Sequence, residues 1–286
     1  MAGDTRDYRM RTTEALLREA LSGPADDLTV TLDPVFQGLP EAAHGGTVLA
    51  LFDALAGQPA AREILAHYRR RVPLAVPLRL GVARRPDAVE YRLLEGDALL
   101  VDGRISAAPA EEGSVTIPTV ASTLLPISRT CFACGIDNAV GLRARLAFDS
   151  RVVGGTWTGS ARFAGRDGTL APLALTTLLD EAAFWLGVLA TGESGMTTEL
   201  RVRLHRRAPA AGLVRVGGER AAVRPRPGDP RYWETRVAAA DAEGRLLASA
   251  AITFVAVRGA ARRLVAMFKG LNPAEVVSRL FPTYTT

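Results

Sequence analysis

Two segments of this chain repeat one pattern at a distance of 127 residues. The first segment, FQGLPEAAHGGTVLALFDALAG, spans residues 36–57, and the second, FAGRDGTLAPLALTTLLDEAAFW, spans residues 163–185. They align without a gap, so that Asp53 of the first corresponds to Asp180 of the second. Because the same element occurs twice in the same sequence context, the chain is expected to consist of two copies of one folding unit.

Each repeated segment is apolar at helical spacing, which predicts a largely buried helix. Alternating stretches follow both segments; in the second copy LRVRLHRR (200–207) and ASAAITFVAV (248–257) have the period of two that is typical of strands. The turns Asp102-Gly103 and Glu243-Gly244 fit hairpins between antiparallel strands. The pattern predicts an α+β fold, in which each half is a curled antiparallel sheet wrapped around one long central helix.

The organisation follows from these positions. An N-terminal helical segment and a C-terminal helical tail flank the repeats, and we expect them to serve as capping or assembly surfaces. The connection between the halves is rich in Ala, Pro, Ser and Thr, which is typical of a linker. The predicted boundaries are 1–26 for the N-terminal segment, 27–106 for the first half, 107–130 for the linker, 131–257 for the second half and 258–286 for the tail.

Composition excludes several classes of protein. A net charge of +5 and a pI near 9.7 would suit an anionic partner, but the cations are nearly all Arg and are spread throughout, so no nucleic-acid partner is expected. No membrane span is expected either, since the most apolar stretch, 170–190, contains Asp180-Glu181. Two cysteines and an N-terminus without an apolar signal core favour a reduced, cytoplasmic protein.

The two cysteines form a Cys131-Phe-Ala-Cys134 motif. This spacing is typical of metal ligands, but tetrahedral zinc needs four ligands and the sequence contains no second pair. The sequence therefore predicts no metal site, and the two thiols are expected to pack in the interior.

The first half begins with QG-x-P-x-x-x-HGG, continues with an apolar helix that has an acid nine residues after the His, and ends in antiparallel strands. This order resembles the hotdog-fold acyl-CoA thioesterases, above all the phenylacetic-acid-degradation type. The segment CFACGIDNAVGLRARL (131–146) is similar to the CFxCGxxNxxGL opening of many members of that superfamily. The resemblance covers residues 28–106 and 131–257. It implies a tandem (double) hotdog fold, in which the two halves form an intramolecular pseudo-dimer.

In that superfamily the active site lies between two paired units, with the loop from one and the catalytic carboxylate from the other. A Gly-rich turn at a helix N-terminus can direct free N–H groups at a thioester carbonyl. The resemblance therefore implies a site that combines one loop with the acid of the opposite helix. The residues of this candidate site are Gln37, His44, Gly45 and Gly46 from the first half and Asp180 from the second.

The reciprocal site would use Asp53 as its acid. The residues that correspond there to Gln37, His44, Gly45 and Gly46 are Ala164, Ala171, Pro172 and Leu173. Proline has no N–H to donate, and leucine would crowd the approach of a substrate. We therefore expect a single asymmetric active site, with Asp53 only a secondary candidate.

Other residues have two interpretations each. His44 fits a structural role in the turn better than that of a general base, and Glu181, about 100° further round the helix than Asp180, is a secondary candidate expected to point elsewhere. Trp185 would fill the core or an acyl pocket. Arg206 and Arg207 would bind the phosphates of coenzyme A or lie on a solvated strand face.

The expected function is hydrolysis of an acyl-CoA or acyl-carrier-protein thioester, with Asp180 as base or nucleophile and no cofactor other than the coenzyme A of the substrate. One alternative is a non-catalytic protein that binds an acyl thioester or serves in assembly. A third is a hydratase or dehydratase, which would use Asp180 with His44. Further pairing into homodimers remains open, and the acyl specificity is not predicted because one residue of strand slip inverts the pocket.

Overall fold

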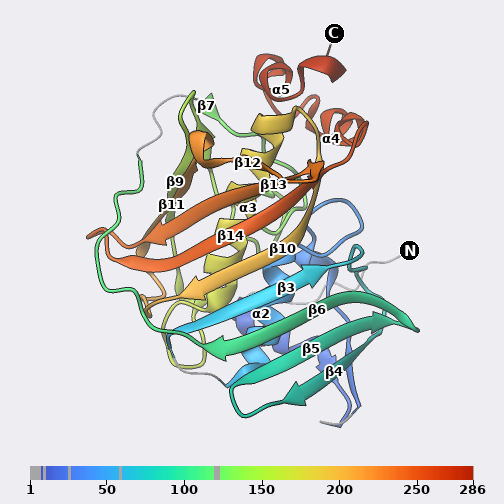
Figure 1. Cartoon of the computed structure of the whole chain (residues 1–286), viewed down its shortest axis with the longest axis vertical. Helices are drawn as coiled ribbons and strands as arrows, with labels where there is room; N and C mark the ends of the chain where they lie inside the picture. The colour runs from blue at the N-terminus through green and yellow to red at the C-terminus, as the bar shows by residue number, and fades with distance from the viewer. Residues whose placement is uncertain (1–7, 9–10, 25–26, 58–59, 119–122, 286) are drawn as a thin grey trace.

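The computed structural model describes residues 8, 11–24, 27–57, 60–118 and 123–285 of the chain. Its strands form one 14-stranded antiparallel sheet that extends through the whole molecule (Figure 1). The strand order is β1-β2-β4-β5-β6-β3-β10-β14-β13-β11-β9-β8-β7, and β12 pairs with β13 outside this path. Strands of the first half thus occupy one side of the sheet and strands of the second half the other.

The first half contains one long helix and a set of antiparallel strands. They are β1 (Leu21–Ser22), β2 (Leu28–Val30), α2 (Gly45–Ala56), β3 (Arg62–Tyr68), β4 (Leu78–Arg84), β5 (Ala88–Glu95) and β6 (Ala98–Ala107). The helix ends at Gly57, whose positive φ of 62° is readily adopted by glycine. Its Phe52 stacks on Tyr91 of β5 with ring centroids 4.9 Å apart, which fixes the helix on the sheet.

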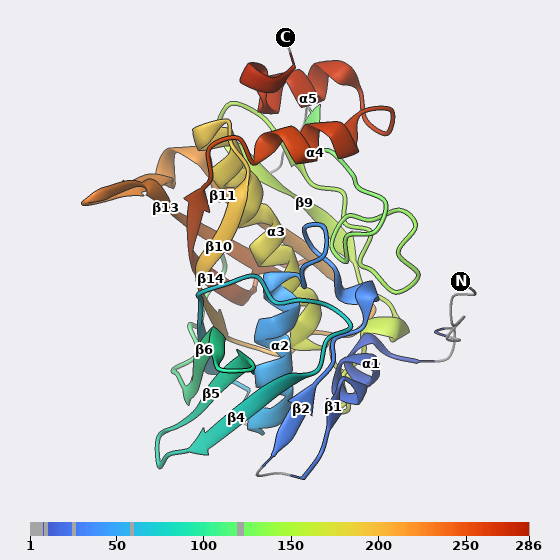
Figure 2. The same ribbon diagram turned by 90° about the vertical axis from the view of Figure 1, so that its right-hand side faces the viewer.

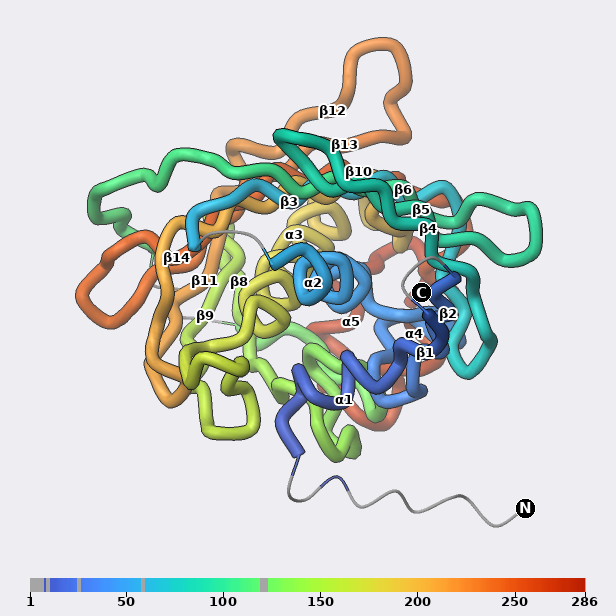
Figure 3. The backbone as a smooth tube through the Cα atoms, turned by 90° about the horizontal axis from the view of Figure 1, so that it is seen from below, coloured from blue at the N-terminus to red at the C-terminus, as the bar shows by residue number. Residues whose placement is uncertain are grey.

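The second half repeats this arrangement with a longer helix. Its elements are β7 (Thr123–Leu124), β8 (Ala147–Phe148), β9 (Val152–Thr158), α3 (Pro172–Thr191), β10 (Gly195–Leu204), β11 (Leu213–Glu219), β12 (Arg224–Arg226), β13 (Asp229–Ala240) and β14 (Leu246–Ala256). Within the described part of the chain, α3 alone is long and apolar enough to span a membrane, but 83% of its most apolar window is buried in the protein. The sheet curves around α2 and α3 (Figure 3).

The two halves meet along one pair of strands. β3 pairs antiparallel with β10, with Ile64 opposite Val202. On the outer face, Glu63 of β3 forms ion pairs with Arg201 and Arg203 of β10, at 2.9 and 2.8 Å. The backbone pairing therefore places the two central helices side by side on the same face of the sheet (Figure 2).

The loops before the two helices form the same hydrogen bonds. In the first half, a 3₁₀ turn (Pro34–Phe36) precedes the loop, and the His44 amide donates to the Phe36 carbonyl at 2.9 Å. In the second half, a 3₁₀ turn (Ala161–Phe163) takes the same place, and the Ala171 amide donates to the Phe163 carbonyl at 2.8 Å. The repeated sequence thus has matching local geometry at both positions.

Helices α2 and α3 come closest at Gly46. A Cβ on Gly46 would lie 2.5 Å from the carbonyl oxygen of Thr176 and 2.7 Å from the Cα of Thr177. The Thr176 hydroxyl also donates to the Gly46 carbonyl at 2.8 Å. Because no side chain separates the two backbones, the N-terminus of α2 lies directly against α3.

The terminal segments cover the ends of this core. Helix α1 (Thr13–Glu19) is N-capped by Thr12 and packs beside the second-half loop, where Glu14 accepts the Arg166 amide at 3.2 Å. Helices α4 (Ala261–Phe268) and α5 (Ala274–Leu280), followed by a 3₁₀ turn (Pro282–Tyr284), lie at the far end of α3 (Figure 2). A further 3₁₀ turn (Arg220–Ala222) follows β11.

Gly46→Ala should lower the free energy of unfolding by about 1–3 kcal/mol, since the added methyl group would force α2 and α3 apart. Chemical denaturation followed by circular dichroism would measure this. Gly81→Ala is the matched control, because its Cβ would lie 3.8 Å from the nearest atom. Equal stability of the two variants would contradict the close approach of the helices.

Candidate active site

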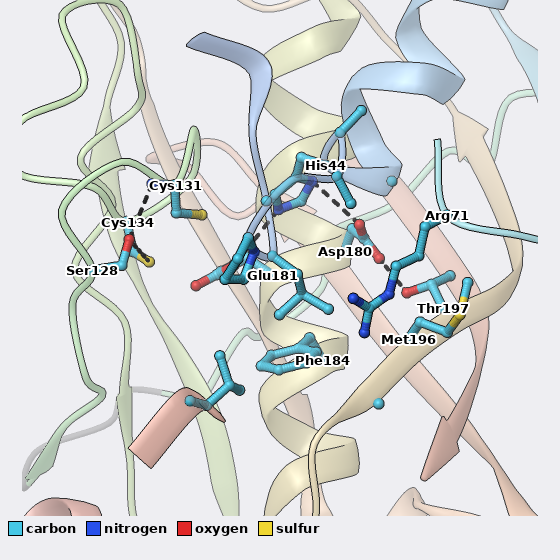
Figure 4. Close-up of a pocket in the computed structure, with 18 of the residues that line it drawn as sticks. His44, Arg71, Ser128, Cys131, Cys134, Asp180, Glu181, Phe184, Met196 and Thr197 are labelled. Atoms are coloured by element: carbon cyan, nitrogen blue, oxygen red, sulfur yellow. Dashed lines mark hydrogen bonds and ion pairs between the residues drawn. The ribbon is translucent and has the colours of Figure 1, made fainter. Parts of the chain in front are cut away.

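A cavity of about 110 Å³ opens where the N-terminus of α2 meets α3, in the space between the two halves (Figure 4). This volume is large enough for several water molecules. The first half contributes the loop that ends at Gly45 and the segment around Arg71, and the second half contributes α3 and the start of β10. One cavity is therefore built from residues of both halves.

Asp180 is the carboxylate at the inner end of this cavity, and it is 5% exposed. Its Oδ2 accepts the Gly46 N–H at 3.0 Å, and its Oδ1 accepts the Thr197 hydroxyl at 2.7 Å. The Gly46 amide is one of the free N–H groups at the start of α2, where negative charge is favoured. An acid from the second half thus binds the helix N-terminus of the first.

His44 lies between two carboxylates of α3. Its Nδ1 is 3.2 Å from Asp180 Oδ2, and its Nε2 is 3.6 Å from Glu181 Oε2. Burial alone would lower the pKa of His44, but the hydrogen bond to Glu181 and the charges of Asp180 and Glu181 raise it from 6.5 to about 9. His44 Nδ1 also accepts the Gly46 N–H at 3.2 Å, so its ring is held from both sides.

Glu181 faces the cavity, so the expectation that it points elsewhere is wrong. Its Oε1 accepts the Trp185 indole N–H at 3.0 Å, while its other oxygen faces His44. Burial would raise the pKa of Glu181, but the hydrogen bond and charge of His44, together with the Trp185 bond, lower it. Asp180 and Glu181 are neighbours on α3, and both contact the His44 ring because that ring lies over the helix between their two side chains.

The two glycines of the turn differ in what their amides do. The Gly46 N–H is already bound to Asp180. The Gly45 N–H donates to no other described residue, and Gly45 lines the cavity. A Cβ at Gly45 would lie 2.7 Å from Asp180 Oδ2, so only glycine lets the turn approach this acid. The free donor of the site is therefore the Gly45 amide.

Gln37 lies outside the cavity lining. Its side-chain amide donates to the Thr130 hydroxyl at 2.6 Å, and its side-chain oxygen accepts the Glu41 amide at 3.3 Å. These two contacts tie the loop to the segment that leads into the second half. Gln37 thus stabilises the loop and does not face the carboxylate of Asp180.

The residues expected to bind substrate lie in two different places. Trp185 lines the cavity with Phe184 and is 2% exposed. Arg206 and Arg207 line a separate cavity at the C-terminal end of α2 and the start of α3, and Arg207 forms an ion pair with Asp167 at 2.9 Å. The structure therefore does not bring these two arginines to Asp180.

Asp53 lies in that separate cavity as well, next to Pro172 and Leu173. Both of its carboxylate oxygens accept hydrogen bonds from the Arg62 guanidinium, at 2.5 and 2.7 Å. The acid that corresponds to Asp180 is thus neutralised by a bidentate arginine, and the helix start beside it carries Pro172 and Leu173 where the other carries two glycines.

Sequence reasoning missed three contributors to the cavity. Thr197, at the start of β10, holds Asp180, and Arg71 reaches over the cavity near it (Figure 4). Arg71 is exposed and forms no ion pair with another described residue. The third is α4, expected to be only a capping or assembly element, which supplies Leu264, Met267 and Phe268 to the wall. Their helical i, i+3, i+4 spacing was the available signal.

Cys131 and Cys134 also line this cavity, at 6% and 8% exposure. They form the wall beyond Glu181, on the side away from Asp180 (Figure 4). The CFACG segment is anchored to the first-half loop, since the Phe132 amide donates to the Gln37 carbonyl at 2.6 Å. The second half therefore contributes both a helix and a cysteine turn to the surroundings of His44.

Tyr68→Phe should lower the free energy of unfolding by about 1 kcal/mol, because the Tyr68 hydroxyl donates to the Gly45 carbonyl at 2.6 Å. Tyr91→Phe is the control, since the buried Tyr91 hydroxyl has no hydrogen-bond partner among the described residues. Thermal and chemical denaturation should show a loss for the first variant and almost none for the second. Equal effects would mean that Tyr68 does not hold the turn.

No protein-family model matches the sequence, and no curated protein matches it. Solved structures do match. A putative thioesterase II from Thermobifida fusca YX is 18% identical with a TM-score of 0.60, covering 85% of this chain and 99% of that one. The tesB protein of Mycobacterium avium subs paratuberculosis is 15% identical with a TM-score of 0.58, covering 85% and 97%.

A dehydratase is among the matches as well. The GphF DH1 variant, described as isomerase-inactive, is 17% identical with a TM-score of 0.51 and covers 84% of this chain and 96% of that one. At these identities the likeness concerns the fold. The antiparallel sheet curved around its central helices is the hotdog fold, and the chain shares that fold with the thioesterase structures.

Proposed function

We propose that this protein hydrolyses an acyl-CoA or acyl-carrier-protein thioester at one site between two hotdog units, which form a pseudo-dimer within the chain. The observation that carries the proposal is the position of Asp180. This carboxylate of α3 meets the glycine turn of α2 inside a cavity, whereas the corresponding Asp53 is bound by Arg62. A buried acid that no arginine of the described residues neutralises, next to an amide without an acceptor, is the combination that acyl transfer to water requires.

The first chemical step is the attack of water on the thioester carbonyl. Asp180 accepts a proton from that water, and the Gly45 N–H donates to the carbonyl oxygen as it becomes negative. The tetrahedral intermediate then expels the thiolate, which leaves readily because the pKa of a thiol is about 8.5, and the proton on Asp180 passes to the leaving sulfur. The products are a carboxylic acid and a free thiol.

His44 and Thr197 act on this step through Asp180. Thr197 donates to one carboxylate oxygen, and His44 faces the other. Together with the Gly46 N–H, they fix the orientation of the carboxylate before the substrate arrives. We therefore assign both side chains as positioning residues.

The rest of the cavity fits the two parts of an acyl thioester. Phe184, Trp185, Met196 and the α4 side chains give an apolar wall for an acyl group. Arg70 and Arg71 lie at the exposed side, where guanidinium groups can bind phosphate oxygens. This division supports a substrate with an apolar acyl end and a phosphate-bearing carrier.

A second candidate function is hydration or dehydration of an acyl thioester. The contact of 3.2 Å between His44 and Asp180, which come from opposite halves, favours it, because such a pair could transfer protons at neighbouring carbons. A third candidate is a protein that binds the thioester without turning it over. All three use the same cavity and differ in the product.

Asp180→Asn should lower kcat/KM for thiol release by about 10²–10⁴-fold, since it removes the proton acceptor. Asp53→Asn is the matched control and should leave turnover near the wild-type value. A thiol-reactive dye and a panel of acyl-CoAs of different chain length would measure both. Equal losses in the two variants would argue against a single site.

The same panel separates the candidates. Release of thiol by the wild type supports hydrolysis. Interconversion of a 3-hydroxyacyl and a 2-enoyl thioester without thiol release would establish the second candidate, and binding of an acyl-CoA with no product of either kind would establish the third.

Thr197→Val should lower kcat by about tenfold to hundredfold, because a hydrogen bond to a charged group contributes about 1.5–3 kcal/mol. Thr197→Ser keeps the hydroxyl and should restore most of the rate. Steady-state kinetics on the best acyl-CoA would show the change in kcat with little change in KM. If Thr197→Ser is as slow as Thr197→Val, the methyl group and not the hydroxyl is what matters.

A further inference from the structure

The CFACG turn holds two sulfur atoms beside the catalytic cavity. The Ala133 amide donates to Cys131 Sγ at 3.3 Å, and the Gly135 amide donates to the Cys131 carbonyl at 2.9 Å. Gly135 is required here, because a Cβ would lie 2.3 Å from that carbonyl oxygen. The Cys134 thiol contacts the Ser128 hydroxyl at 3.9 Å, and the same hydroxyl oxygen accepts the Cys131 amide at 3.0 Å. A tight turn that brings two buried cysteines close together, with an N–H aimed at one sulfur, is suited to bind a soft cation.

Two further ligand groups come from other parts of the chain. One ligand atom each of His44, Cys131 and Glu181 lies within 4.8 Å of the other two. Cys134 lies outside this group, with its thiol 3.9 Å from the Ser128 hydroxyl, and it would turn toward the other three to become the fourth ligand. Figure 4 shows Cys131, Cys134, His44 and Glu181 around one region of the cavity wall.

We propose that Cys131, Cys134, His44 and Glu181 form a binding site for one Zn²⁺ ion. Tetrahedral zinc with its usual bond lengths places neighbouring ligand atoms about 3.3–3.8 Å apart. The 3.6 Å between His44 Nε2 and Glu181 Oε2 lies within this range. The ion takes the place of the proton that these two atoms otherwise share.

The surroundings of the four ligands fit a metal site. A zinc-bound histidine usually donates its other ring N–H to a carboxylate, and His44 Nδ1 lies 3.2 Å from Asp180 Oδ2. The free oxygen of Glu181 accepts the Trp185 indole N–H at 3.0 Å. All four ligand residues are less than 10% exposed, so the ion would be protected from water.

The ligands belong to three segments: the loop before α2, the CFACG turn and α3. Zinc would therefore cross-link the first half to the second at the point where they build the cavity. With four protein ligands, zinc keeps no open position for water or substrate, which is typical of a structural site. It would also occupy His44 Nε2, so His44 could act only through Nδ1, toward Asp180.

The first test measures metal content. Protein purified from zinc-supplemented medium under reducing conditions should contain about one zinc ion per chain by mass spectrometry. The double variant Cys131→Ser/Cys134→Ser should contain almost none, and Asp53→Asn, which changes an acid on the other central helix, should keep the ion. Zinc in neither wild type nor Asp53→Asn would overturn the proposal, as would equal zinc in all three proteins.

The second test does not depend on a folded double variant. Wild-type protein stripped with a chelator is titrated with Co²⁺, which reports thiolate ligation and tetrahedral geometry through its absorption. We expect saturation at about one equivalent, loss of the signal on adding Zn²⁺, and a higher Tm with either ion. A titration without thiolate-to-cobalt absorption would overturn the proposal.

Asp180→Asn separates this proposal from the proposed function. This variant keeps all four ligands and loses only the carboxylate that orients His44, so zinc should remain bound with about 10–100-fold lower affinity. Competition with a chromophoric chelator would measure that change. Zinc binding without thioesterase activity in the wild type would leave the site standing and reject the hydrolase, and the reverse result would do the opposite.

Discussion

The N–H group of Gly46 is satisfied by a carboxylate from the other half of the chain, and much of the molecule is arranged around this contact. The first amides of a helix have no partner within it and attract negative charge. Asp180 supplies that charge at 3.0 Å, which is possible only because the two backbones touch at Gly46 without a Cβ. The pairing of β3 with β10 holds the helices in that position. The pairing of the two halves therefore brings the residues of the cavity together.

The difference between the two acids follows from their neighbours. Asp180 contacts an amide, a hydroxyl and an imidazole, none of which is a permanent cation that would neutralise its charge. Asp53 binds both arms of the Arg62 guanidinium, a partner that holds its charge permanently. The same position on two similar helices thus carries the acid of the proposed active site in one case and a structural ion pair in the other.

Local patterns were enough to predict the two central helices, and the resemblance to the hotdog superfamily supplied the pairing of a first-half loop with a second-half acid. The 127-residue offset aligned Phe36 with Phe163, and both end a 3₁₀ turn before their loops. These local patterns could not predict the direction in which individual side chains point. Glu181 reaches His44 because of how the loop lies over α3, and Gln37 turns to Thr130 because of a segment 93 residues away. Thr197 was missed since no local motif marks a strand residue that supports an acid on the preceding helix.

Helix α4 lies outside both repeated halves, yet it closes one end of the cavity with Leu264, Met267 and Phe268. None of these side chains takes part in the hydrogen bonds that hold Asp180. Helix α4 therefore limits the depth of the cavity, whereas other segments of the chain hold Asp180. In the proposed hydrolase, larger or smaller side chains along this one turn of α4 would change the length of acyl group that fits and leave the reacting atoms untouched.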